Sequence, residues 1–267
     1  MATSTYASSP GRITTEPLLN ARLLGRGVAG GLMGGAVLAM FMMIVMAANG
    51  SGFWSPLNLG ISAFAFTVVP PLSMLPSLMT LMGISLPASA MPMIQSAIAS
   101  GHFTPAVMNK LVAMLTAMHV PASQIHAMAP LMSGTATNAD VAALMRMMTV
   151  SQRDTMMGMM PVSPGRVIVG MMLHFMMSAV LGVVFLVIFR AARRVGLTLV
   201  EGPMGALAAG MLGGALVYAV MRWILLPPTN SMMAFVPQWA FFLAHLMFGA
   251  VVGLVVARGS HPRSVRA

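Results

Sequence analysis

The chain has 267 residues, of which 58% are hydrophobic and only 7% are charged, and its mean hydropathy is +0.88. Charged residues make up about a quarter of an ordinary soluble domain, so this composition excludes that class and indicates a protein of the lipid bilayer. The chain has no cysteine, which excludes disulfides, thiolate metal sites and cysteine nucleophiles.

Residues 1–26 are a polar, Ser/Thr-rich leader, which we predict to be disordered and cytoplasmic. The uncharged run of residues 27–48 is long enough to cross a hydrocarbon core of about 30 Å as a helix. A signal peptide is the alternative, because small residues follow at Ala47 and Ala48. Its apolar core is typically only about 7–15 residues long, so we expect a retained first span.

Three further apolar runs, residues 167–189, 204–226 and 239–257, predict an integral membrane, all-α protein with four transmembrane helices. The second and fourth spans resemble each other. Residues 174–185 (HFMMSAVLGVVF) and 245–256 (HLMFGAVVGLVV) align at a constant offset of 71 and are identical at six of twelve positions. Each of these segments therefore reads as one copy of a repeated membrane helix that contains a histidine.

The first and third spans also share a pattern. The Gly-rich segment 31–36 is echoed by residues 210–215, and Pro-x-Asn follows each span, at residues 56–58 and 228–230. We infer a tandem duplication of a two-helix hairpin, interrupted in its first copy by an insertion. The expected units are the leader 1–26, the first half of repeat 1 over 27–70, the insertion over 71–165, the second half of repeat 1 over 166–194, repeat 2 over 203–258 and a cytoplasmic tail over 259–267.

Arginines lie before the first span and after the second and fourth spans: Arg12, Arg22, Arg26, Arg190, Arg193, Arg194, Arg258, Arg263 and Arg266. The positive-inside rule places these flanks in the cytoplasm, with both termini inside a bacterial cytoplasmic (inner) membrane. Attraction to anionic headgroups explains the net charge of +10, so we expect the lipid bilayer and no nucleic acid as a partner.

The insertion then lies outside the cytoplasm and is rich in methionine. Prolines at positions 70, 71 and 76 break the apolar stretch 61–86, which we interpret as interfacial or re-entrant. Apolar periodicity and helix-start residues predict short helices over 104–119, 121–132, 138–149 and 151–160.

His174 and His245 are the candidate cofactor-binding residues. They lie at nearly the same depth in two spans that run in the same direction, so both could face one central space. Two imidazoles so placed could ligate a haem iron axially or contribute to a metal site. The alternatives are hydrogen bonding between helices, to a main-chain carbonyl or to Ser178, and a place along a solute pathway.

Methionine is the second unusual feature, with 33 residues in the chain. Thioether sulfur suits Cu(I), so the insertion is a candidate copper site. Its ligands would be Met156, Met157, Met159 and Met160, together with His119 and His126. The alternative is hydrophobic packing, because methionine is an adaptable filler of apolar interiors.

The spans contain no acidic residue, which removes carboxylate acid–base chemistry, so we do not expect an enzyme.

The Gly-rich first span, residues 54–58 (WSPLN), the histidine that opens the second span and the later Pro-x-Asn resemble a group of uncharacterised bacterial four-helix inner-membrane proteins. That resemblance covers the spans only and implies no activity.

The leading interpretation is a binding or accessory membrane protein. Its histidine pair would hold haem or a metal or would organise the bundle, while the insertion would dock a protein partner or a soft metal. The rival is a permeation module for small solutes or ions, in which Gly-rich faces pack the subunits of a homo-oligomer.

Overall fold

The computed structural model describes residues 20–197 and 202–258, and every regular element within those ranges is helical. Four segments are long and apolar enough to cross a membrane. They are α1 (Ala21–Ala48), α8 (Pro164–Arg194), α9 (Gly202–Val220) with its continuation to Thr229, and α11 (Gln238–Ala257). The prediction of an all-helical chain with four such helices is confirmed.

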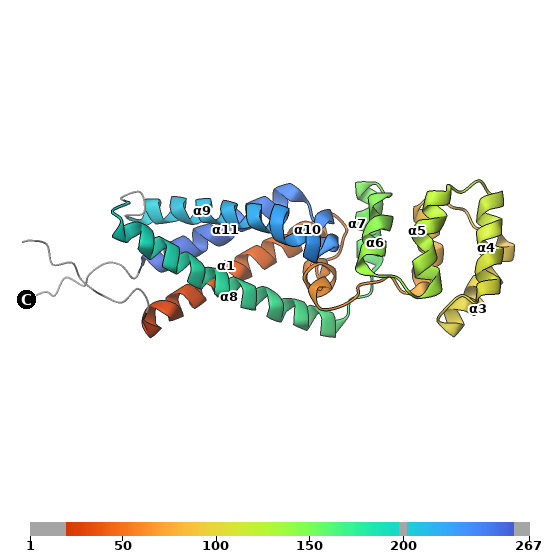
Figure 1. The fold of residues 1–267 in the computed structure, drawn as a ribbon, viewed down its shortest axis with the longest axis horizontal. Coiled ribbons are helices and arrows are strands. Elements are labelled where there is room, and N and C mark those ends of the chain that lie inside the picture. The colour runs from red at the N-terminus through yellow and green to blue at the C-terminus, as the bar shows by residue number, and fades with distance from the viewer. Residues whose placement is uncertain (1–19, 198–201, 259–267) are drawn as a thin grey trace, which may run out of the picture.

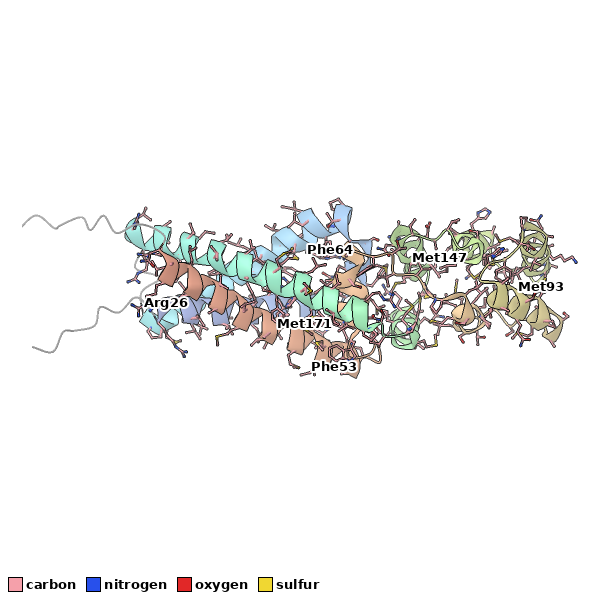
Figure 2. All side chains as sticks on the ribbon, turned by 90° about the horizontal axis from the view of Figure 1, so that it is seen from below. Arg26, Phe53, Phe64, Met93, Met147 and Met171 are labelled. Atoms are coloured by element: carbon pink, nitrogen blue, oxygen red, sulfur yellow. The ribbon has the colours of Figure 1, made fainter. Side chains whose placement is uncertain are left out.

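The four long helices form one elongated bundle (Figure 1). Helix α1 packs against α8 on one side and α11 on the other, and α11 packs in turn against α9. The remaining helices, α2 to α7, continue the molecule beyond one end of the bundle. Arg26 lies near the opposite end, whereas Met93 lies near the far end of the insertion (Figure 2).

The first helix begins earlier than its apolar run. Asn20 caps α1 by accepting a hydrogen bond from the Leu23 amide at 2.9 Å, so Arg22 and Arg26 belong to the helix. The prediction that residues 20–26 belong to a disordered leader is therefore wrong, because a cap and not hydrophobicity sets the helix start. Residues 1–19 and the expected tail 259–267 lie outside the described residues.

The third apolar segment is not one regular helix. Helix α9 passes into a π-helical turn η6 (Met221–Leu225) and then the short α10 (Leu226–Thr229). The fourth span begins shortly after the 3-10 turn η7 (Ser231–Phe235). These short elements close the end of the bundle that faces the insertion.

Two close contacts between the long helices use small residues. Gly31 of α1 lies against the main-chain carbonyl of Ser178 in α8, and a Cβ at Gly31 would come within 2.9 Å of that carbonyl carbon. Gly210 of α9 lies in the same way against Gly249 of α11, where a Cβ would come within 3.0 Å of the carbonyl carbon. Such contacts bring two helix backbones together by van der Waals packing.

The insertion is a stack of short helices around its own apolar core, which includes Leu111, Met128, Met132 and Met145. Its helices are α2 (Leu75–Leu81), α3 (Met91–Ser100), α4 (Pro105–Ala117), α5 (Ala122–Ser133), α6 (Asn138–Arg146) and α7 (Val150–Met159). The short turns η3 (Leu72–Met74) and η4 (Ala88–Ala90) also lie in the insertion, whereas η1 (Pro56–Gly60) and η2 (Ile61–Phe64) precede it. Four of these helices lie close to the ranges expected from periodicity.

The stretch 61–86 divides between the two parts of the molecule. Its first turn, η2, packs against α8, while Leu75, Leu78 and Met79 of α2 are buried in the core of the insertion. Asn138 at the start of α6 joins the parts, because its side chain donates to the carbonyls of Ala63 and Phe66. The insertion is thus fastened to the bundle by the hydrogen bonds of Asn138 and by an apolar core that also includes Met46 of α1 and Met232 of η7.

Candidate functional site

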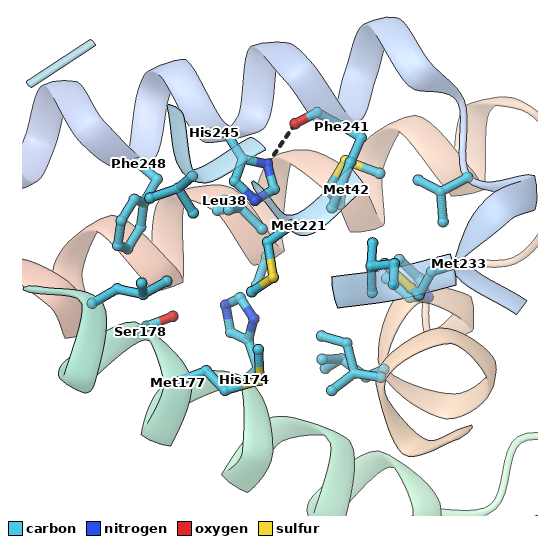
Figure 3. A pocket seen from close by; sticks show the side chains of 18 of the residues that line it. Leu38, Met42, His174, Met177, Ser178, Met221, Met233, Phe241, His245 and Phe248 are labelled. Atoms are coloured by element: carbon cyan, nitrogen blue, oxygen red, sulfur yellow. Dashed lines mark hydrogen bonds between the residues drawn. The ribbon is translucent and has the colours of Figure 1, made fainter. Parts of the chain in front are cut away.

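Both histidines line one cavity of about 90 Å³ inside the bundle (Figure 3). His174 comes from the middle of α8 and His245 from α11, and both side chains are buried, with 8% and 5% of their surface exposed. The cavity is also lined from α1 and from the helical turns at the end of the bundle nearest the insertion. The expectation that the two rings share a central space matches this arrangement.

His174 connects two helices. Its Nε2 lies 2.8 Å from the carbonyl oxygen of Gly35 in α1. A carbonyl oxygen only accepts hydrogen bonds, so Nε2 carries the proton and Nδ1 keeps the lone pair. Glycine at position 35 leaves room for this contact, since a Cβ there would lie 3.4 Å from Nε2 and 2.7 Å from Cβ of Ser178.

His245 is held by its own helix. Its Nδ1 donates to the carbonyl oxygen of Phe241 at 2.7 Å, so Nε2 keeps the lone pair. The Phe241 ring lies 4.3 Å from the imidazole at 74°, and the Tyr218 ring of α9 lies 6.0 Å away. The hydrogen bond and the aromatic neighbours fix the ring and direct it into the cavity (Figure 3).

The two imidazoles thus share one arrangement, in which one nitrogen donates to a main-chain carbonyl and the other carries a lone pair. Histidines that ligate metals are typically oriented in this way, by a second hydrogen bond that fixes the tautomer. A histidine used only to join helices needs the donated bond alone. His174 makes such an interhelical bond, whereas the bond from His245 stays within α11.

The other cavity residues supply sulfur and hydrocarbon. Four methionines line the cavity together with the hydroxyl of Ser178: Met42, Met177, Met221 and Met233. In Figure 3 the Met221 side chain projects into the space between the two imidazoles. Within residues 20–197 and 202–258, no group of three or more His, Asp or Glu side chains is placed to hold a metal ion.

A second space, of about 410 Å³, lies between α8 and α9 and is lined by apolar residues. It shares Leu181, Val217 and Met221 with the histidine cavity, so these side chains separate the two spaces. Phe185 of α8 reaches across to Gly213 of α9 within it. An apolar lining favours hydrocarbon or a neutral molecule over a hydrated ion.

The copper ligands predicted in the insertion are spread over several elements. Met156, Met157 and Met160 are buried in the apolar core, and Met159 is exposed. The exposed His119 follows α4 and the exposed His126 lies on α5, whereas the methionines lie on or just after α7 nearer the bundle (Figure 1). Packing accounts for the buried methionines, and copper binding in this segment stays a prediction.

The sequence did not predict that these four methionines would meet in one cavity. They come from α1, α8, η6 and η7, which lie far apart in the chain, and no spacing pattern joins them. Their only sequence signal was the excess of methionine, which runs through the whole chain.

No protein-family model matches this chain, and neither a curated protein nor a solved structure shows significant similarity to it.

Proposed function

We propose that this chain is a multi-pass protein of the bacterial cytoplasmic membrane that binds a small ligand at its buried histidine pair. One observation carries the proposal. Two imidazoles from different helices line one cavity, and one nitrogen of each ring is hydrogen-bonded to a main-chain carbonyl, which leaves the lone pair on the other nitrogen. Ionisable side chains placed inside an apolar bundle commonly mark a functional site.

The proposed orientation has both termini in the cytoplasm and the insertion outside it. Arginines gather at one end of the bundle, at the start of α1 and at the ends of α8 and α11. Exposed tryptophans lie at the other end, at positions 54, 223 and 239. This distribution follows the positive-inside rule and the interfacial preference of tryptophan. The insertion is then free to meet a protein partner on the outer side.

We also propose that the two helix pairs arose by duplication of one hairpin. The contact of Gly31 with the Ser178 carbonyl has its counterpart in Gly210 with the Gly249 carbonyl. In both pairs the same spacing places a histidine one turn before that contact: the His174 ring lies next to Gly35, and the main-chain carbonyl of His245 lies next to Gly214. Residues at equivalent positions thus lie in contact in both pairs, through the imidazole in the first and through the main-chain carbonyl in the second.

The size of the cavity favours a small ligand over haem. Pockets for drug-sized molecules begin at roughly 300 Å³, and haem is at least of that size. The cavity of about 90 Å³ that both rings line has room for an ion or for a few molecules the size of water. A haem would require the helix pairs to separate, so a metal ion or a small neutral molecule is the better-supported ligand.

The proposed function is tested by elemental analysis of the detergent-purified full chain, beside the His174→Gln, His245→Ala double variant. Glutamine keeps a donor for the Gly35 carbonyl, so α1 and α8 stay joined. We expect one bound ligand per chain in the wild type and none in the double variant. Equal ligand content in both, at equal folding, would refute the proposal. The permeation alternative would need liposome flux that the double variant abolishes.

A further inference from the structure

We propose that the ligand of the histidine cavity is a soft monovalent cation, Cu(I), bound by Nδ1 of His174, Nε2 of His245 and the thioether of Met221. This inference rests on the proposed function and names its ligand. It places the copper site inside the bundle, away from the methionine cluster of the insertion.

The donor set fits this ion. The polar or polarisable groups that line the cavity are two imidazoles, four thioethers and one hydroxyl. Thioethers select Cu(I) among biological metals, imidazole binds copper readily, and carboxylates and carbonyls suit harder ions. Met221 projects between the rings (Figure 3), and Met42 also lines the cavity. The cavity therefore offers nitrogen and sulfur together, around a space of ionic size.

Charge also favours a monovalent ion. The remaining cavity walls are apolar, so a bound ion gives up its hydration without a negative side chain beside it in the lining. The Born free energy of removing an ion from water scales with the square of its charge, so this cost is about a quarter as large for Cu(I) as for a divalent ion of the same size. Two neutral imidazoles and a thioether can offset that smaller cost.

The irregular backbone at Met221 supports its role as a ligand independently of the donor set. Met221 begins the π-helical turn η6, where the regular helix of α9 ends. π-helical turns are rare and occur frequently at functional sites. Met221 lines both the cavity and the apolar space beside it.

The test is an anaerobic titration of the detergent-purified full chain with Cu(I) against a chromophoric chelator, repeated with redox-inert Ag(I). Met221→Leu removes the sulfur at nearly constant volume. The matched control is Met211→Leu, an exposed methionine two turns or more earlier on α9. We expect one Cu(I) per wild-type chain, binding weakened by about tenfold or more in Met221→Leu, and no change in the control. X-ray absorption should show mixed nitrogen and sulfur ligation.

The outcomes separate the two proposals. If the double histidine variant loses the ligand while Met221→Leu binds Cu(I) like the wild type, the thioether assignment is overturned and the histidine site stands. Binding that survives both sets of changes places copper elsewhere and overturns both proposals. Should Met221→Leu lose its monodisperse elution profile, Met221→Ile replaces it under the same criterion, because it also removes the sulfur at nearly constant volume.

Discussion

The two helix pairs of the bundle, α1 with α8 and α9 with α11, pack through the same kind of glycine contact but hold their histidines differently. In each pair a glycine lies against a main-chain carbonyl of the partner helix, Gly31 against Ser178 and Gly210 against Gly249. The pairs differ one turn away. His174 donates across its interface to Gly35, whereas His245 donates within its own helix to Phe241.

Ser178 explains part of this difference. Its side chain occupies the space beside Gly35, where the second pair has Gly249 and only main-chain atoms in contact. The first pair therefore leaves room for a side chain and for an imidazole bond across the interface. The second is packed backbone to backbone, and its histidine turns into the cavity. Histidines at equivalent positions thus differ in their hydrogen bonds: His174 joins two helices, whereas His245 is held by its own helix.

The largest expected effect comes from filling the shared glycine contact. Gly31→Leu and Gly210→Leu each place a side chain against a main-chain carbonyl that cannot move away cheaply. We expect each to cost about 3 kcal/mol or more and to lower the thermal midpoint in detergent by roughly 10 °C. Thermal unfolding followed by size-exclusion chromatography measures this loss.

The control for these variants is Gly25→Ala, because Gly25 lies on α1 with open space around it. Alanine there should stabilise the helix by up to about 1 kcal/mol. If Gly31→Leu unfolds at the same temperature as Gly25→Ala, α1 and α8 do not pack as closely as the structure has them.

A second prediction exchanges the residues that distinguish the pairs. Ser178→Gly should be mild, with a cost of at most about 1 kcal/mol from helix propensity. Gly249→Ser should cost about 1–3 kcal/mol, because its Cβ would come within 2.8 Å of the Gly214 amide nitrogen. The measurement is the free energy of unfolding in mixed detergent. Equal costs for the two substitutions would remove the proposed distinction between the interfaces.

A third prediction concerns the asparagines that follow α1 and α9. Asn58 donates to the Pro161 carbonyl and accepts from the Ser163 amide, and so holds the start of α8. Asn230 donates to the Gly60 carbonyl in the other half of the bundle at 2.8 Å. Alanine at either position leaves buried groups without partners, which costs about 1–3 kcal/mol.

The two asparagine variants should differ in where they loosen the protein. Asn58→Ala should raise hydrogen exchange at the start of α8, and Asn230→Ala should raise it around Gly60. The exposed Asn49 provides the control, as Asn49→Ala should leave both segments protected. Matching exchange patterns for Asn58→Ala and Asn230→Ala would contradict the separate roles.

Sequence alone predicted the apolar helices well because their signal is hydrophobic length. It also predicted that the two histidines would share a central space, because each lies a similar number of residues into its apolar run, and both do line one cavity. It misplaced the start of α1, where Arg22 and Arg26 interrupt the apolar pattern and the cap at Asn20 decides the boundary.

The cavity itself could not be derived from the sequence. Its sulfur donors come from segments brought together only by packing, and Met221 is directed by a π-helical turn for which the chain carries no recognisable signal. The hydrogen-bond partners of the two histidines were also inaccessible. His174 and His245 occupy equivalent places in nearly equivalent sequences, and the neighbouring helix decides which carbonyl each one reaches.

The smallest expected effect on stability tests most directly whether His174 bonds between helices and His245 within one helix. His174→Ala removes a hydrogen bond between α1 and α8 and leaves the Gly35 carbonyl without it, so we expect a loss of about 0.5–1.5 kcal/mol. His245→Ala removes a bond within one helix, where the Phe241 carbonyl keeps its place in the backbone ladder, so the loss should be smaller. Ligand binding should be lost in both.

His174→Gln refines the comparison, because its amide can still donate to Gly35 while its oxygen is a poor ligand for a soft metal. Stability close to the wild type together with lost metal binding would separate the structural bond from the ligating nitrogen. If His245→Ala instead proves the more destabilising change in chemical unfolding, the second histidine also holds its helix pair together, and the contrast drawn from Gly35 and Phe241 fails.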